Sequence, residues 1–148
     1  MTRFTRALTA SALALSMVLA PTGVAHAQSS FGMSSAATQN STEQRLRAAA
    51  EGAMSRSGHR INESAARQAR TILKRALSGD FIYFDGQATY FAPDFSGGAV
   101  IYRIPNSDVE RVISELETGS ADFSFSAPKG FAAGSDDTHH YLVEYTLL

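Results

Sequence analysis

The stretch GGAVIYRIPNSDVERVISELETG, residues 97–119, decides the fold class, because it changes from a strand pattern to a helix pattern at a single proline. Residues 99–104 are rich in β-branched and aromatic side chains, which is typical of a strand, and Pro105 ends it. Beyond the proline, apolar residues recur three and four positions apart, which predicts one buried face of a helix: Val109, Val112, Ile113 and Leu116.

The start and end of this helix also have sequence signals. Ser107 and Glu110 have the spacing of a capping box, in which the serine hydroxyl and the glutamate side chain each accept a bond from a free backbone N–H. We therefore expect the helix to begin at Ser107 and to close before Gly119.

Two further helices are expected earlier in the chain. Ser41, with Gln44 at capping-box spacing, predicts the start of the first, and Gly58 its end. Asn62 predicts the cap of the second, which Gly79 stops. The apolar positions of the two helices share one face in each case, and they are Leu46, Ala49, Ala50, Ala53 and Met54, then Ala65, Ala69, Ile72, Leu73 and Ala76.

The rest of the chain favours extended structure. Residues 81–84 and 89–91 are expected to be short strands or extended loops, 122–127 a half-buried strand and 140–148 the last strand, whereas residues 130–137 are interpreted as a turn region. Helices at the front, strands later and one helix among the strands predict an α+β domain, with a small and mainly antiparallel sheet.

The N-terminus has the pattern of an export signal. Arg3 and Arg6 precede an apolar run over residues 7–19, and small residues at Ala25 and Ala27 predict cleavage before Gln28. We therefore expect a signal peptide over 1–27, a flexible spacer over 28–40 and a single domain over 41–148 that acts outside the cytoplasm. The apolar run is too short to span a bilayer as a helix, so no transmembrane anchor is expected after cleavage.

Composition excludes several classes of protein. The chain has no cysteine, so neither disulfides nor a lipid-modified cysteine are expected. Without the signal, 11 basic residues face 14 acidic ones, which does not indicate a nucleic-acid binder. Residues 43–75 carry eight basic and three acidic residues, and the remainder to the C-terminus three and eleven. The two parts can attract each other within one fold, or the first can form a basic face for an anionic polymer or lipid surface.

Several short segments resemble the CAP superfamily, also called the SCP-like or cysteine-rich secretory/antigen 5/pathogenesis-related proteins. The resemblance covers roughly residues 44–148 and is carried by the segments 57–69, 78–81, 98–101, 130–134 and 141–145. It implies an α-β-α sandwich, with the first two helices on one side of the sheet and the helix from Ser107 on the other. It also implies lipid or sterol binding as one family-level function.

The chain departs from that family at the metal site. Tyr83 stands where the family commonly has a histidine, and Ala99 where it has a glutamate. No histidine occurs at 120–123, where the second one is expected. The resemblance therefore implies a member without the family's metal-binding residues, and we expect no cofactor.

A non-catalytic binding module is the leading functional hypothesis. Seven aromatic residues fall within residues 81–102, and the tyrosines among them combine an apolar ring with a polar tip. An aromatic-lined groove beside the basic second helix would hold an apolar or anionic ligand, such as a lipid or an envelope polymer. The candidate groove residues are Tyr83, Tyr90, Tyr102, Arg67, Arg70 and Lys74.

Two other functions stay open at this point. A cell-wall hydrolase or peptidase would need His59, His139 or His140 to meet a carboxylate such as Glu144. A structural or inhibitory protein would use a flat surface without a groove.

The only dense cluster of metal-ligand types is weak as a metal site. It consists of Asp136, Asp137, His139 and His140. In a strand the two histidines would point to opposite faces, so a turn with two aspartates is the more common explanation.

Overall fold

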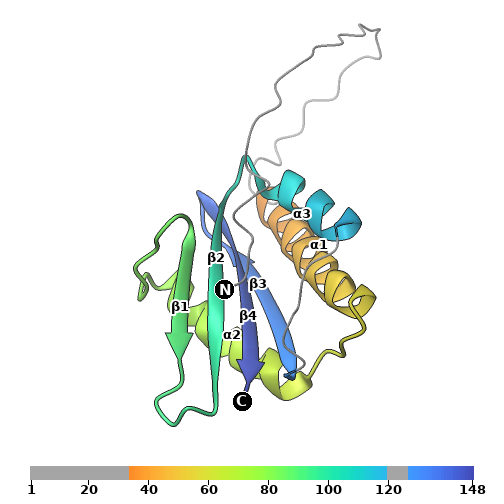
Figure 1. Cartoon of the computed structure of the whole chain (residues 1–148). Coiled ribbons are helices and arrows are strands. Elements are labelled where there is room, and N and C mark those ends of the chain that lie inside the picture. Colours follow the sequence, from red (N-terminus) through yellow and green to blue (C-terminus); the bar gives the residue numbers. More distant parts are fainter. Residues whose placement is uncertain (1–33, 120–126) are drawn as a thin grey trace, which may run out of the picture.

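A computed structural model describes residues 34–119 and 127–148. In this part of the chain, three helices and four strands follow one another in the order ααββαββ (Figure 1). The elements are α1 (Ser34–Arg56), α2 (Glu63–Leu77), β1 (Gln87–Phe91), β2 (Gly97–Pro105), α3 (Val109–Thr118), β3 (Lys129–Ser135) and β4 (His139–Leu147).

The strands form one antiparallel sheet in the order β1-β2-β4-β3. The last strand of the chain, β4, is therefore central, and β1 and β3 are the edges. In the β2–β4 ladder Ile101 lies opposite Val143, which lies opposite Ala132 of β3. Because all three side chains point to the same face, they form one continuous stripe under helix α2.

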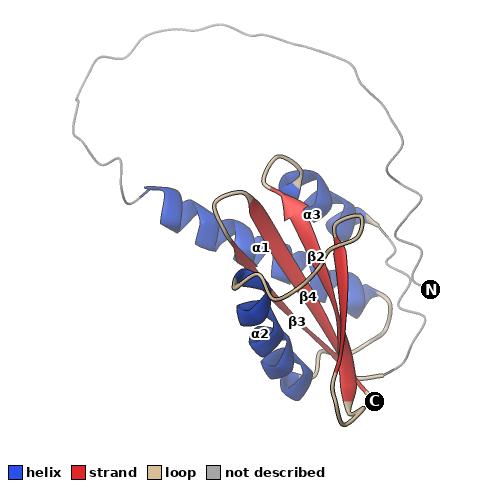
Figure 2. Ribbon diagram, turned by 90° about the vertical axis from the view of Figure 1, so that its left-hand side faces the viewer, coloured by secondary structure: helices blue, strands red, loops and turns tan. Residues whose placement is uncertain are grey.

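The sheet lies between two helical layers, with α1 and α3 on one face and α2 on the other (Figures 1 and 2). The predicted α+β class with helices on both faces of an antiparallel sheet is confirmed. The expected grouping of the first two helices is wrong. The link between them crosses the β3 edge, where Ile61 forms a parallel bridge with Lys129, so that α1 and α2 take opposite faces.

Each layer has its own core. Leu46 and Met54 of α1 and Ile113 of α3 pack against Phe131 of β3 on one face. Ala65, Ala69 and Ile72 of α2 pack on the other face. All ten apolar positions predicted for the first two helices are buried.

The predicted turn region over 130–137 is wrong for most of its length, because β3 continues to Ser135. Gly130 and Gly134 indicate a turn in the sequence, yet here they face α2. A Cβ placed on Gly130 would lie 2.1 Å from the backbone nitrogen of Ala66. Glycine at position 130 is therefore required by the close approach of the helix rather than by a turn.

Two predicted helix starts also differ. Helix α1 begins at Ser34 rather than Ser41, because no glycine or proline stands between these positions to stop the helix. Helix α3 begins at Val109 with Asp108 as its N-cap, and the Asp108 side chain makes no capping bond. The predicted Ser107–Glu110 capping box is absent, because Glu110 is bound by Arg45 of α1 instead.

The remaining predictions are mostly confirmed. Asn62 accepts a bond from the amide of Ala65 at 3.0 Å and caps α2, and Gly79 adopts a positive φ of 81° just beyond its end. Residues 81–84 are an extended loop with a single bridge to β1. The strand expected over 122–127 falls almost wholly outside the described residues.

Candidate binding groove at the β3 edge

Strand β3 forms an edge of the sheet, and two hydrogen bonds show which way its backbone faces. On the outer side, the amide of Asn62 donates to the carbonyl of Lys129 at 2.7 Å. On the inner side, the amide of Leu147 in β4 donates to the carbonyl of Pro128 at 2.9 Å. The N–H and C=O groups of successive strand residues point alternately to the two sides of the strand. Those of the odd-numbered residues of β3 therefore point away from the sheet.

Ala133 and Ser135 therefore direct their backbone N–H and C=O groups away from the sheet. Within the described ranges, these groups have no hydrogen-bond partner. Ala133 is half-buried, so the open backbone lies in a recess rather than on a flat surface.

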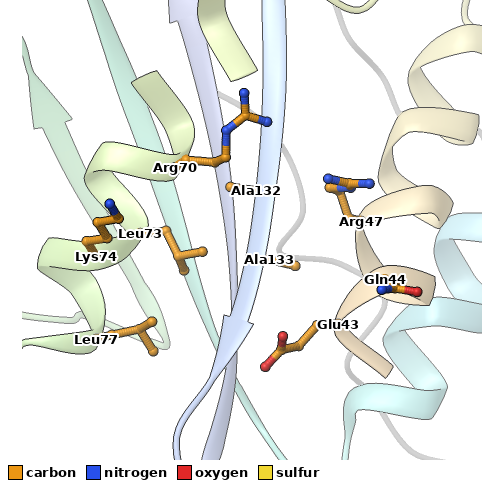
Figure 3. Close-up of a pocket in the computed structure, with 9 residues that line it drawn as sticks. All are labelled: Glu43, Gln44, Arg47, Arg70, Leu73, Lys74, Leu77, Ala132 and Ala133. Carbon is orange, nitrogen blue, oxygen red and sulfur yellow. The ribbon is translucent and has the colours of Figure 1, made fainter. Parts of the chain in front are cut away.

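A groove of about 320 Å³ lies along this edge, between α1 and α2 (Figure 3). Its volume is at the lower end of the range for ligand pockets in proteins. Side chains from α1 and α2 stand on either side of β3. The lining residues are Glu43, Gln44 and Arg47 of α1, Arg70, Leu73, Lys74 and Leu77 of α2, and Ala132 and Ala133 of β3.

The groove carries more positive than negative charge. Arg70 donates to Glu63 at 2.7 Å, and Arg47 lies 3.6 Å from Glu51, but both pairs are solvent-exposed or half-exposed. The bond from Arg70 lowers the pKa of Glu63. Lys74 has no ion-pair partner among the residues that the structure describes. An anionic group entering the groove would meet these three cations.

The single carboxylate of the groove is engaged in a hydrogen bond. Glu43 accepts a bond from the hydroxyl of Ser135 at 2.5 Å. Across the ladder from Ser135 lies His140, which is 5% exposed, and neither of its ring nitrogens has a hydrogen-bond partner among the residues that the structure describes. Burial lowers the pKa of His140, although the nearby Glu43 carboxylate raises it. The serine hydroxyl bonds the carboxylate rather than the imidazole, so the three groups do not form a nucleophilic relay.

The predicted groove residues divide among three places. Arg70 and Lys74 line the groove, whereas Arg67 lies outside it and donates to Ser64 at 2.9 Å. The three tyrosines are not in the groove either.

The tyrosines themselves are on two faces of the sheet. Tyr83 and Tyr90 pack on the α2 face, each beneath a guanidinium: that of Arg103 is 5.5 Å from the Tyr83 ring, and that of Arg75 is 5.2 Å from the Tyr90 ring. Tyr102 packs on the α1–α3 face, where burial and then the Glu144 carboxylate raise its pKa. The structure does not bring the three into one aromatic-lined groove.

The aspartate–histidine cluster is a hairpin turn. Asp136 accepts bonds from the Thr138 amide at 2.8 Å and hydroxyl at 2.9 Å, and from the His139 amide at 2.8 Å. Asp137 uses its carbonyl to accept a bond from Asn106. His139 and His140 point to opposite faces, and no group of three or more metal-ligand side chains lies together in the described ranges.

The residues considered for a hydrolase lie apart. Glu144 of β4 forms a buried ion pair with Lys129 of the neighbouring strand β3. His59 lies at a second pocket of about 340 Å³ beside α1, whose lining includes no carboxylate. The nitrogen of His139 closest to Asp136 is 4.0 Å from its carboxylate, beyond hydrogen-bond distance.

Sequence reasoning missed Glu43, Arg47 and the β3 edge. The available signal was that positions 130, 132 and 134, which would share one face of a strand, are all small, as a closely packed helix requires. The chain matches no protein-family model, no curated protein and no solved structure. None of the described helices has the length and apolar character needed to cross a membrane.

Proposed function

We propose that the protein is a non-enzymatic binding module that holds an acidic, extended ligand in the groove between α1 and α2. One observation carries this proposal: Arg47 from α1 and Arg70 and Lys74 from α2 line the two walls of a recess whose floor is an open strand edge. The proposal keeps the basic second helix of the sequence hypothesis and replaces the tyrosines with the β3 edge.

The walls of the groove are fixed by the core, which favours binding over a passive surface. Leu73 is 9% exposed and packs into the α2 layer, while its neighbour Lys74 is exposed at the groove. On α1, Leu46 is fully buried next to the half-exposed Arg47. The charged side chains therefore start from helix backbones that are held in place by packing, and a ligand would need to order only their outer ends.

We also propose that the protein acts outside the cytoplasm, on the strength of the signal pattern over residues 1–27. The ligand would then belong to the envelope or the extracellular space. Membership of the CAP superfamily stays a prediction, and the proposed function does not rest on it.

Charge reversal in the groove tests the function. Poly-L-glutamate, inorganic polyphosphate and phosphatidylglycerol vesicles serve as probes in a titration of the purified protein. Lys74→Glu should weaken binding of an acidic chain by about tenfold or more, and added salt should weaken binding to the native protein, because exposed charges are screened.

Arg67→Glu is the matched control, because it makes the same charge reversal on the same helix but outside the groove. It should leave binding nearly unchanged. Equal losses in the two variants would mean attraction to net charge alone, and the absence of binding to every acidic probe would overturn the proposal.

A further inference from the structure

The β3 edge offers main-chain hydrogen bonds as well as a charged surrounding. Ala133 and Ser135 each direct one backbone N–H donor and one C=O acceptor outward. One residue lies between them, which is the spacing at which a neighbouring strand pairs with an edge. A peptide in extended conformation could pair with both residues. A polyphosphate or a lipid headgroup could not use the alternation of donors and acceptors.

This edge lacks the protection that exposed strands usually have. Natural edges are blunted by prolines, bulges or outward charges. β3 has no proline, and its only charged residue, Lys129, is buried against Glu144 instead of guarding the edge. Helices α1 and α2 stand on either side of the edge, and the groove between them reaches Ala132 and Ala133 of β3 (Figure 3).

The two walls indicate what the side chains of such a strand would be. Side chains of an added strand point alternately toward α2 and toward α1. The α2 wall presents Leu73 and the exposed Leu77 beside Arg70 and Lys74. The α1 wall presents Arg47 together with Gln44 and with Glu43, which accepts a bond from Ser135. Acidic side chains facing Arg70 and Lys74, alternating with small apolar side chains facing α1, would match this pattern.

We infer that the partner is an acidic segment of a protein chain that adds as a strand to the free edge of β3. This inference rests on the proposed function, since it names the class of ligand for the same groove. Main-chain pairing supplies affinity in this mode of recognition, and the side chains on the walls supply specificity.

The test separates main-chain pairing from charge. A short blocked peptide of alternating glutamate and valine is compared with the same peptide N-methylated at its central amides, which keeps the charge but removes donors. The N-methylated peptide should bind about tenfold more weakly, because the acceptors that it meets in the half-buried groove lose their partners.

A protein variant gives the second arm. Ala133→Pro removes the outward N–H of β3 and leaves the ladder to β4, which uses residues 132 and 134, with all its donors. It should weaken the unmethylated peptide by about tenfold and weaken polyphosphate much less, because polyphosphate does not pair with the strand backbone. The comparison of peptides needs no variant, so it decides the question even if this variant does not fold.

The outcomes distinguish the two proposals. If both peptides bind equally and Lys74→Glu still abolishes their binding, the groove is an anion site and the strand-addition inference is overturned. If neither peptide nor any other acidic probe binds, both proposals fall together.

Discussion

Gly130 of β3 lies directly against the backbone of Ala66 in α2, with no room between them for a methyl group. A Cβ on Gly130 would be 2.1 Å from the Ala66 nitrogen and 2.5 Å from its Cα. Helix α2 thus approaches the sheet more closely than ordinary side chains permit. The position of α2, and with it one wall of the groove, depends on this contact.

The first prediction follows from this contact. Gly130→Ala should lower the free energy of unfolding by about 3 kcal/mol, because the helix must move away from a rigid backbone to admit the methyl group. Denaturant unfolding measures the change. Gly52→Ala in α1 is the control, since its Cβ would meet only the tip of Arg56 at 3.3 Å, and it should stabilise the protein by up to about 1 kcal/mol. Equal effects in the two variants would contradict the close approach.

Local pattern was sufficient to predict helix α2 but not strand β3. Ala65, Ala69 and Ile72 repeat at helical spacing, and Asn62 has a cap geometry that needs only its neighbours. Gly130 is small because another element packs on it, and that reason lies in the tertiary structure. A glycine in a sequence indicates a turn and a close approach equally well.

The groove could be predicted only in part for the same reason. Arg70 and Lys74 share a helix, so their proximity follows from spacing. Arg47 joins them because the link between α1 and α2 crosses the sheet edge at Ile61, which places the two helices on opposite faces of β3. No local pattern determines which face a helix takes, because both faces of the central strand are buried.

The second prediction concerns the buried pair of Lys129 and Glu144, whose side chains are 9% and 10% exposed. Lys129→Met should cost about 3–5 kcal/mol of stability, because it leaves a carboxylate buried without its cation. Combining it with Glu144→Leu should restore most of the loss, since two apolar side chains replace the whole pair. A double-mutant cycle in denaturant measures the coupling.

The exposed pair of Arg111 and Glu115 provides the comparison for this cycle. Arg111→Gln should change stability by less than about 1 kcal/mol, as solvent-exposed pairs usually do. Additive losses at Lys129 and Glu144, with no recovery in the double variant, would show that the two side chains do not depend on each other.

The third prediction uses the buried imidazole of His140. Burial lowers its pKa. This effect outweighs the nearby carboxylates of Glu43, Asp136 and Glu110, which raise the pKa. The unfolded chain therefore takes up a proton near pH 6.5 that the folded chain accepts only at lower pH. The contribution of His140 to stability is complete above about pH 6.5 and is lost as the pH falls below that value.

His140→Phe should remove this dependence. The difference in the free energy of unfolding between the variant and the native protein should grow in favour of the variant from about pH 7 to pH 5. At neutral pH the substitution should cost little, because both ring nitrogens lack hydrogen bonds to residues 34–119 and 127–148. Two parallel stability curves over this range would rule out a buried neutral histidine.

The fourth prediction concerns Tyr141, whose hydroxyl donates to Asp136 at 2.7 Å. Burial and then this bond raise the pKa of Tyr141 to about 12. The unfolded chain loses the phenol proton near pH 10, so stability should fall as the pH rises from there toward the folded value. Tyr141→Phe should lack this alkaline loss, which ultraviolet titration of tyrosinate and unfolding at high pH can measure.

The same substitution should have a second, acid-side signature. Partial burial raises the pKa of Asp136, but bonds from Tyr141, Thr138 and His139 outweigh it and hold the pKa well below its usual range. These bonds stabilise the fold above about pH 4 and lose their effect as the pH falls through the lowered pKa. Tyr141→Phe should thus cost about 1–2 kcal/mol at neutral pH and progressively less in acid, because a protonated carboxyl no longer needs the donor. Phe keeps the ring that packs beside Tyr83, so a penalty that stays constant down to low pH would mean that ring packing, rather than the bond to Asp136, had been lost.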